Sequence, residues 1–332
     1  MKNIVLKILT VVVFYLFSFG QGLAITPHGK KGLLPNEGSC SINDGTPLNN
    51  TKTSTLVNLE IPKTNPGEII VKHIGYSLLY NETHEQASWV AYELTKEESH
   101  KIYERSDKFI PDPEVKTGTA NDSDYAGSGY DRGHIAPAAD MSWSDTAMDE
   151  SFYYSNMSPQ EPSFNRGVWK KLEELVRTWA VENNSVYIVS GPVLTEGLPA
   201  IGPHKVSVPK YYYKVILDYT EPIIKGIGFI IPNSGSNEQL QQFAVSIDSV
   251  EKFTGLDFFP LLLDQQEDLI EKTVCVSSWS WENTKTKSKV KAENKETKTG
   301  QCKGITKSGA RCKNKASNNT GYCHHHIGQK HN

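Results

Sequence analysis

The chain has 332 residues and a formal net charge of −3, and 37% of its residues are hydrophobic. This length is sufficient for one large domain with a hydrophobic core and an appendage. The 25 glycines and 17 prolines, together with many Val, Ile and Tyr residues, favour a mixed α and β fold over a helical bundle.

The small net charge conceals two parts of opposite sign. Residues 25–284 contain 21 basic and 36 acidic residues, a net charge of −15, whereas residues 285–332 contain 11 Lys and 1 Arg against 2 Glu, a net charge of +10. A basic tail is typical of an anionic partner such as nucleic acid or a membrane surface. The alternative is a solvated, lysine-rich linker.

The N-terminus predicts export. Two lysines accompany an apolar run over residues 8–19, which is too short to span a membrane and has the length of a signal-peptide core. Small residues at positions 22 and 24 form a cleavage site, so we predict a signal peptide over 1–24 and a secreted or periplasmic protein. Once the signal is removed, no membrane segment is expected. The alternatives are an N-terminal membrane anchor and a buried helix.

The remaining elements follow in chain order. Residues 25–65 are rich in turn-forming residues and predict an irregular segment, and residues 114–130 predict a long polar loop of the kind that is often functional. Apolar patterning predicts strands over 68–80, 89–94, 186–189, 206–219 and 223–231, the last two as a hairpin. Apolar residues at helical spacing predict helices over 165–182 and 244–253. These elements define a domain over residues 66–282, followed by a basic linker over 283–300.

Residues 130–177 combine the groups that a phosphodiesterase needs. His134 follows Asp131, Arg132 and Gly133, and an imidazole can accept a proton from water near working pH. Asn165 begins the predicted helix and offers a hard, neutral oxygen suited to Mg²⁺. Ordinary alternatives are a surface histidine and an asparagine helix cap.

Three further residues complete this set. Glu173 lies about a quarter-turn round the helix from Asn165 and could accept hydrogen bonds from metal-bound water. Arg177 and Arg105 offer planar donors that match phosphate oxygens. A surface ion pair between Glu173 and Arg177 is the alternative interpretation. One base, one metal ligand and two phosphate-binding arginines together indicate phosphodiester hydrolysis.

Residues 75–281 resemble the DNA/RNA non-specific endonucleases of the ββα-metal, or His-Me finger, class, which include secreted bacterial nucleases and endonuclease G. The resemblance is densest over residues 131–134, 155–160 and 165–173. It implies an α+β fold in which a ββα-metal finger lies on a central, mainly antiparallel sheet flanked by helices. It also implies that His134 activates water, that Asn165 is the only direct protein ligand of Mg²⁺, with Mn²⁺ as a substitute, and that Glu173 holds the water shell of the metal. The other residues to which it gives a role at the site are Arg105, Asp131, Asn156 and Arg177.

The expected function is therefore a Mg²⁺-dependent endonuclease that cuts DNA and RNA to 5′-phosphorylated products, since contacts to phosphate and sugar read no sequence. An unperturbed imidazole predicts that activity falls below about pH 6. Two alternatives are a nucleic-acid-binding protein that has lost catalysis and a zinc-dependent hydrolase centred on residues 324–326. A homodimer is left open.

Cysteines divide between the domain and the tail. Cys302, Cys312, Cys323 and His326 match the Cys₃His set of a structural zinc site, and residues 301–327 resemble a small Cys/His-rich module appended to many bacterial proteins. A disordered basic tail with incidental cysteines is the alternative. In an exported protein Cys40 and Cys275 could form a disulfide, with two buried thiols as the alternative.

Overall fold

The computed structural model describes residues 56–282, 301–306 and 309–314, together with Cys323 and His326. The predicted signal peptide, most of the irregular N-terminal segment, Cys40, the 283–300 linker, and two of the three consecutive tail histidines lie outside these residues. No helix in the described ranges is both long and apolar enough to cross a membrane.

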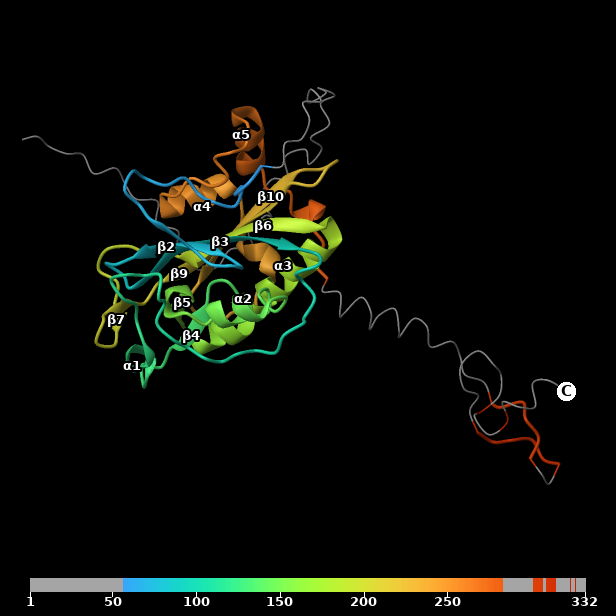
Figure 1. Ribbon diagram of the computed structural model, residues 1–332. Helices are drawn as coiled ribbons and strands as arrows, with labels where there is room; N and C mark the ends of the chain where they lie inside the picture. The colour runs from blue at the N-terminus through green and yellow to red at the C-terminus, as the bar shows by residue number, and fades with distance from the viewer. Residues whose placement is uncertain (1–55, 283–300, 307–308, 315–322, 324–325, 327–332) are drawn as a thin grey trace, which may run out of the picture. The chain divides into compact units, whose positions relative to one another are not determined.

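A seven-stranded sheet, antiparallel at every pairing, forms the centre of the domain (Figure 1). Its strands lie in the order β1-β2-β3-β6-β9-β10-β11. Their bounds are β1 Ile70–Lys72, β2 Ser77–Asn81, β3 Gln86–Thr95, β6 Ser185–Pro192, β9 Tyr211–Asp218, β10 Lys225–Pro232 and β11 Ala244–Val245. The predicted α+β fold with a mainly antiparallel sheet is thus confirmed.

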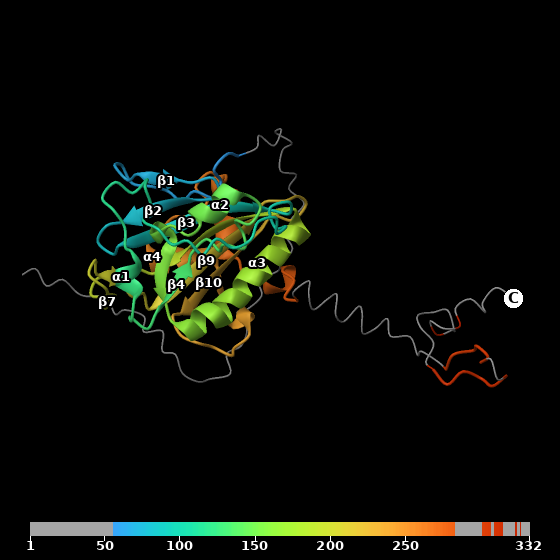
Figure 2. The same ribbon diagram turned by 60° about the horizontal axis from the view of Figure 1, so that its bottom comes forward.

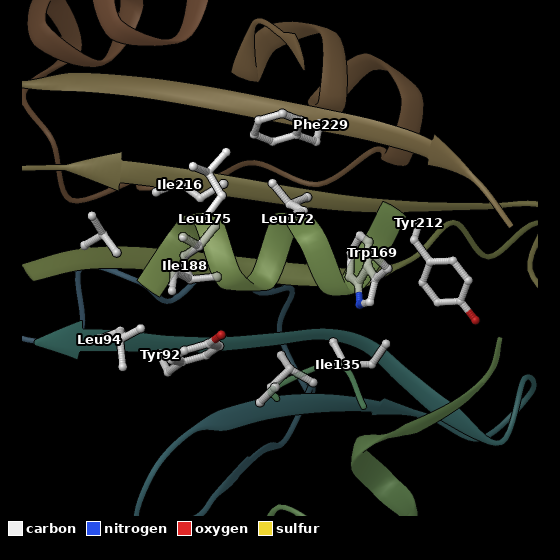
Figure 3. Close-up of a cluster of buried hydrophobic side chains, with 14 of the residues drawn as sticks. Tyr92, Leu94, Ile135, Trp169, Leu172, Leu175, Ile188, Tyr212, Ile216 and Phe229 are labelled. Atoms are coloured by element: carbon white, nitrogen blue, oxygen red, sulfur yellow. The ribbon is translucent and has the colours of Figure 1, made fainter. Parts of the chain in front are cut away.

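The two faces of the sheet contact different hydrophobic cores, because successive side chains of a strand point to opposite faces. On β9, Tyr212 and Ile216 belong to the first core, and Tyr213 and Val215 to the second. Helix α3 (Lys170–Asn183) covers the first core, and Figure 3 shows its apolar side chains beside those of the strands. Helices α4 (Ile247–Thr254) and α5 (Asp264–Lys272) cover the second core, on the other side of the sheet (Figure 1).

A second, two-stranded sheet holds the most informative sequence motif. Strands β4 (Asp131–His134) and β5 (Met157–Gln160) pair antiparallel, with His134 opposite Met157. A π-helical turn, η2 (Phe164–Trp169), follows β5 and leads into α3. Strands β4 and β5 and helix α3 form the expected ββα unit, and Figures 1 and 2 both place β4 on the same side of the large sheet as α3.

Several predicted elements are divided in the structure. The strand predicted over 68–80 is the hairpin β1-β2, in which His73 N–H donates to Tyr76 O at 2.8 Å. The helix predicted over 165–182 becomes α-helical only at residue 170, because the backbone of Gly167 is not helical (φ −109°, ψ −107°). The strand predicted from 206 begins as β8 (Val206–Ser207), which pairs with β7 (Ala200–Ile201), and β9 starts after Pro209.

The remaining elements are short. The predicted helix over 244–253 is β11 followed by α4, which starts one residue after its N-cap Ser246. The predicted polar loop over 114–130 contains one helical turn. The bounds of the remaining helices are α1 Asp122–Tyr125, α2 Asp145–Glu150, η1 Tyr154–Asn156, η3 Leu240–Phe243 and η4 Val276–Ser278.

Candidate active site

His134 ends β4 as a buried imidazole that is held by aromatic rings. The residue is 9% exposed, and its ring lies edge-on to Phe152 at 4.8 Å and to Phe109 at 5.9 Å between centroids. Its Nε2 atom is buried and has no hydrogen-bond partner within the described ranges. The preceding Gly133 packs so closely on Gln160 that a Cβ atom would lie 2.1 Å from the side-chain Cδ. The unpartnered Nε2 atom is therefore the nitrogen of His134 that can accept a proton.

Two arginines lie on the rings that hold His134. The guanidinium carbon of Arg105 lies 4.7 Å from the centre of the Phe152 ring, and that of Arg132 lies 3.9 Å from the centre of Phe109. Such contacts hold a cation in place without using all of its hydrogen-bond donors. Arg132 was not singled out from the sequence, although its position in the motif beside His134 was an available signal. The hollow that they line also contains three carboxylates, and each arginine donates to one of them at 2.6 Å.

Burial and the two arginines favour the neutral imidazole. They lower the pKa of His134 to about 3, with burial as the largest cause and the charges of Arg105 and Arg132 as the next. The unperturbed pKa assumed from the sequence is therefore wrong for this site. The neutral base persists well below pH 6, so His134 does not set an acid limit of activity there.

This lowered pKa predicts how stability depends on pH. Between pH 6.5 and 3 the unfolded chain binds a proton at position 134 and the folded chain does not, so this contribution to stability is complete above pH 6.5 and falls as pH decreases. Between pH 7 and pH 5 the metal-free wild type should lose about 2 kcal/mol more than His134→Gln in urea unfolding. The exposed His100 supplies the matched control variant, His100→Gln. Equal slopes for wild type and His134→Gln would contradict the lowered pKa.

Asn156 fixes the main chain that follows His134. Its side chain is fully buried; Nδ2 donates to Ala136 O at 2.9 Å and to Ser151 O at 2.8 Å, and Oδ1 accepts from Ala136 N at 2.9 Å. These bonds use both N–H donors of a fully buried amide, so Asn156 positions the strand end rather than touching a substrate.

Asp131 orients the side chain of Asn165. Arg166 donates to both carboxylate oxygens of Asp131, at 2.6 and 2.9 Å, and Asn165 Nδ2 donates to Oδ2 at 2.8 Å. Because a carboxylate only accepts, the amide nitrogen must face Asp131 and the carbonyl oxygen must point elsewhere. Asn165 is not a helix cap, since it lies inside η2.

The oriented oxygen of Asn165 fits a hard divalent cation. Within the described part of the chain no donor bonds to this Oδ1 atom, and neutral amide and carboxylate oxygens are the ligands that Mg²⁺ accepts. Asn165 and Asp131 line a hollow of about 570 Å³ together with Arg105 and Arg132. The residues present therefore fit Mg²⁺ with most of its water shell retained.

Arg177 belongs to a neighbouring buried network. Its NH1 donates to Asp140 Oδ1 at 2.6 Å, and Tyr92 donates to the other carboxylate oxygen at 2.7 Å. Asp140 is 1% exposed, so the surface pair between Glu173 and Arg177 considered from the sequence is not the main contact. Arg177 and Arg105 line a second hollow, of about 480 Å³. Arg105 thus borders both hollows.

Glu173 lies among charged groups inside the domain. Burial raises its pKa, whereas the charges of Lys214 and Arg177 oppose that rise. Lys214 is buried on β9, where its Nζ donates to Ser190 Oγ at 3.0 Å, and burial lowers its pKa. No hydrogen bond joins Glu173 to His134 or Asn165 among the residues described. Lys214 and Asp140 were not predicted from the sequence; the signal for Lys214 was a lysine at a core-facing position, between Tyr212 and Ile216.

The Asp140–Arg177 pair predicts a stability effect. Asp140→Asn should lower the free energy of unfolding by about 3 kcal/mol, because removal of one partner leaves the other charge in a mostly buried position. This loss is at the low end of the range for broken buried ion pairs because the Arg177 side chain is 20% exposed. Urea denaturation would measure this. Asp268→Asn removes an exposed pair with Lys272 and should cost less than about 1 kcal/mol. Equal losses in the two variants would contradict the buried role of Asp140.

The described tail residues form a compact ligand cluster of their own. His326 Nδ1 lies 3.7 Å from Cys302 Sγ and 3.3 Å from Cys323 Sγ, and Cys312 Sγ lies 3.8 Å from Cys323 Sγ. Backbone N–H groups of Gly304 and Cys323 donate to Cys302 Sγ at 3.3 and 3.1 Å. The four predicted zinc ligands thus lie together. The disulfide between Cys40 and Cys275 stays a prediction, because Cys40 is outside the described residues.

Known protein families match the domain and the tail separately. A sequence model of the DNA/RNA non-specific endonuclease family matches residues 54–265. The chain belongs to this family. Residues 299–332 match a domain of unknown function, DUF5763.

Curated relatives and a solved structure agree with the family. The mitochondrial nuclease EXOG of Danio rerio is 38% identical over 211 residues, which are 58% of this chain and 62% of that relative's length. A nuclease of Nostoc is 35% identical over 64% of this chain and 81% of its own. The structure of an EndoG/EndoGI complex matches with a TM-score of 0.57 and 31% identity, covering 62% of this chain and 90% of that one. The chain therefore spans less than two thirds of the EXOG relative.

Proposed function

We propose that this chain is a secreted, Mg²⁺-dependent endonuclease that hydrolyses phosphodiester bonds in DNA and RNA. One arrangement supports this most strongly: two arginines lie on the aromatic rings that hold a neutral imidazole with an unpartnered nitrogen, and the same arginines line a hollow together with Asn165. Family membership agrees with that chemistry.

The chain's own residues perform defined parts of the reaction. His134 Nε2 takes a proton from the attacking water, which forms a bond to phosphorus as the bond between phosphorus and the 3′-oxygen breaks. The N–H groups of Arg105 and Arg132 that are not bonded to carboxylates donate to the phosphate oxygens as charge develops on them, and Arg177 borders the neighbouring hollow. The leaving 3′-oxygen takes a proton from solvent, so the products have 5′-phosphates. Asp131 and Asn156 keep Asn165 and His134 in position.

Asn165 would hold the metal ion, and Glu173, on α3, would hold the water shell of that ion. When bound, Mg²⁺ would supply Lewis-acid stabilisation of the negative charge on the scissile phosphate. The side chains bordering the hollows bind phosphate and not base edges, so low sequence preference and acceptance of both polymers are expected.

The secreted location is proposed from the N-terminal sequence. A short apolar run with small residues after it has the pattern of a signal peptide. The animal relatives are named as mitochondrial nucleases, and Nostoc has a related protein named simply as a nuclease. Detection of a mature protein that begins at residue 25 in the periplasm or medium would support export, and a retained N-terminus would contradict it.

A gel assay tests the activity. Purified mature chain is incubated with plasmid DNA and with RNA, in Mg²⁺ and in EDTA. We expect both polymers to be degraded in Mg²⁺ and neither to be degraded in EDTA. Binding without cleavage would favour the inactive nucleic-acid-binding alternative. Cleavage that is lost when residues 301–332 are removed, although zinc is supplied, would instead favour a hydrolase centred on the tail.

We further propose that the tail binds one structural Zn²⁺ through Cys302, Cys312, Cys323 and His326. Tetrahedral bonds of about 2.3 Å to sulfur and about 2.0 Å to nitrogen give ligand separations of about 3.5–3.8 Å. The measured separations of 3.3, 3.7 and 3.8 Å are close to these values. Backbone donors to Cys302 Sγ suit a thiolate, and burial of all three cysteines suits a closed site.

Metal analysis tests this proposal. The full chain should contain one zinc per molecule, and Cys312→Ser should reduce that content at least about tenfold while Mg²⁺-dependent cleavage persists. Cys275→Ser serves as the matched control and should keep the zinc. Absence of zinc from wild type purified under reducing conditions with zinc supplied would contradict the site.

A further inference from the structure

Three carboxylates meet on the face of the sheet opposite α3. Asp248 and Glu251 lie on α4 and Glu271 lies on α5, and one carboxylate oxygen from each lies within 4.8 Å of the others. The two helices are neighbours above the second hydrophobic core (Figure 1). In the sequence, Glu271 follows Asp248 and Glu251 by 20 positions or more, so only the fold brings the three residues together.

Glu271 is the most unusual member of the cluster. It is 6% exposed, and its Oε1 atom is buried without a hydrogen-bond partner among the described residues. Burial and the charges of neighbouring carboxylates raise its pKa to about 9. A buried carboxylate without a partner is costly, so this position favours either a bound proton or a bound cation.

The lysines near the cluster do not neutralise Glu271. Lys252 is exposed and lies 3.6 Å from Asp248, and Lys272 is exposed and pairs with Asp268 at 2.9 Å. Lys63 pairs with Asp257, one of the acidic groups that raise the pKa of Glu271. Within the described residues no basic side chain lies within 4.0 Å of the Glu271 carboxylate. The buried Glu271 carboxylate is therefore surrounded mainly by other acidic groups.

We propose that Asp248, Glu251 and Glu271 bind a Ca²⁺ ion. Three oxygens within 4.8 Å of one another each lie no more than about 2.8 Å from a common point, so small side-chain adjustments, without movement of the helices, bring them to the Ca²⁺–oxygen distance of about 2.4 Å. Ca²⁺ accepts several carboxylates in flexible geometry, whereas Mg²⁺ retains its water. Glu251 already accepts the Phe258 N–H at 2.9 Å through Oε1, which holds its carboxylate in place. The ion would link α4 to α5 and stabilise the second core, away from His134 and Asn165.

Thermal unfolding of the full chain tests the site. Ca²⁺ is first removed with EGTA, the chelator is dialysed away and Zn²⁺ is restored. Ca²⁺ is then titrated at constant Mg²⁺ and Zn²⁺, so the other two metal sites do not change. The melting temperature of wild type should rise by about 5 °C at a 100-fold excess of Ca²⁺ over its dissociation constant, with one ion bound per chain in calorimetry. Glu271→Gln should weaken binding at least tenfold and leave the Mg²⁺-dependent cleavage rate unchanged. Asp268→Asn, on the same helix, should bind like wild type.

Three outcomes would overturn the proposal. No Ca²⁺-dependent shift in wild type, combined with a higher melting temperature for Glu271→Gln, would mean that the cluster holds a proton. An equal shift from additional Mg²⁺ would reject Ca²⁺ as the ion. Unaltered Ca²⁺ binding in Glu271→Gln would place the ion elsewhere.

Discussion

Replacement of His134 by alanine should lower the rates of plasmid and RNA cleavage by about 10²–10⁴-fold, the usual contribution of a positioned general base. The loss should be the same for both polymers, because one imidazole serves both. His134 is the proposed proton acceptor because its imidazole is neutral and its Nε2 atom has no hydrogen-bond partner among the described residues. Single-turnover rates with labelled DNA and RNA would measure the effect.

The controls separate catalysis from folding. His134→Ala opens a space between Phe109 and Phe152, so circular dichroism and melting temperature must show that the variant is folded. Binding of DNA in EDTA, followed by fluorescence anisotropy, should stay within about threefold of wild type, since His134 adds no charge. His100→Ala should cleave like wild type. Cleavage at the wild-type rate in folded His134→Ala would show that the base lies elsewhere.

Replacement of Asn165 by alanine should lower cleavage at least about 10²-fold and should raise the Mg²⁺ concentration needed for half-maximal rate. Mutation of a group that only orients a metal ligand typically lowers metal affinity or activity about 10–100-fold, and loss of the sole protein ligand should lower it further. Asp131→Asn should fall in that 10–100-fold range, because an amide at 131 no longer forces the Asn165 nitrogen toward itself. Rates measured across a Mg²⁺ titration would separate weaker metal binding from slower chemistry.

Asn237 offers a matched control for Asn165. It is exposed and lies in a loop, so Asn237→Ala should keep the wild-type rate and Mg²⁺ dependence. A folded Asn165→Ala variant with an unchanged Mg²⁺ titration would remove Asn165 from the metal site. A loss in Asn165→Ala with no loss in Asp131→Asn would retain the ligand and reject the orienting role of Asp131.

The part of the site that sequence predicted well is local in the chain. His134, Asn156 and Asn165 lie within about thirty residues, in motifs whose strand, turn and helix also form locally, and the structure brings them to one ββα unit. The helix start was placed five residues early, because apolar spacing does not reveal the non-helical backbone of Gly167.

Other features depend on contacts between distant segments. Asp140 matters because Tyr92 and Arg177 reach it from a strand and a helix, and Lys214 matters because β9 carries it beneath α3. The lowered pKa of His134 arises from burial and from Arg105, which lies about thirty residues away in sequence. The carboxylate cluster on α4 and α5 likewise requires the packed fold. Residue patterns therefore identify the reacting groups, whereas their protonation and support follow from tertiary structure.

Competition between the two polymers tests most directly whether a single metal-dependent site cuts both. Initial rates of labelled DNA cleavage in Mg²⁺ would be measured with increasing unlabelled RNA, and the polymers would then be exchanged. The proposed site predicts purely competitive inhibition in both directions, with each inhibition constant equal to the Michaelis constant of that polymer as substrate. DNA cleavage that is unaffected by saturating RNA, or a chain that cuts only one of the two, would contradict it.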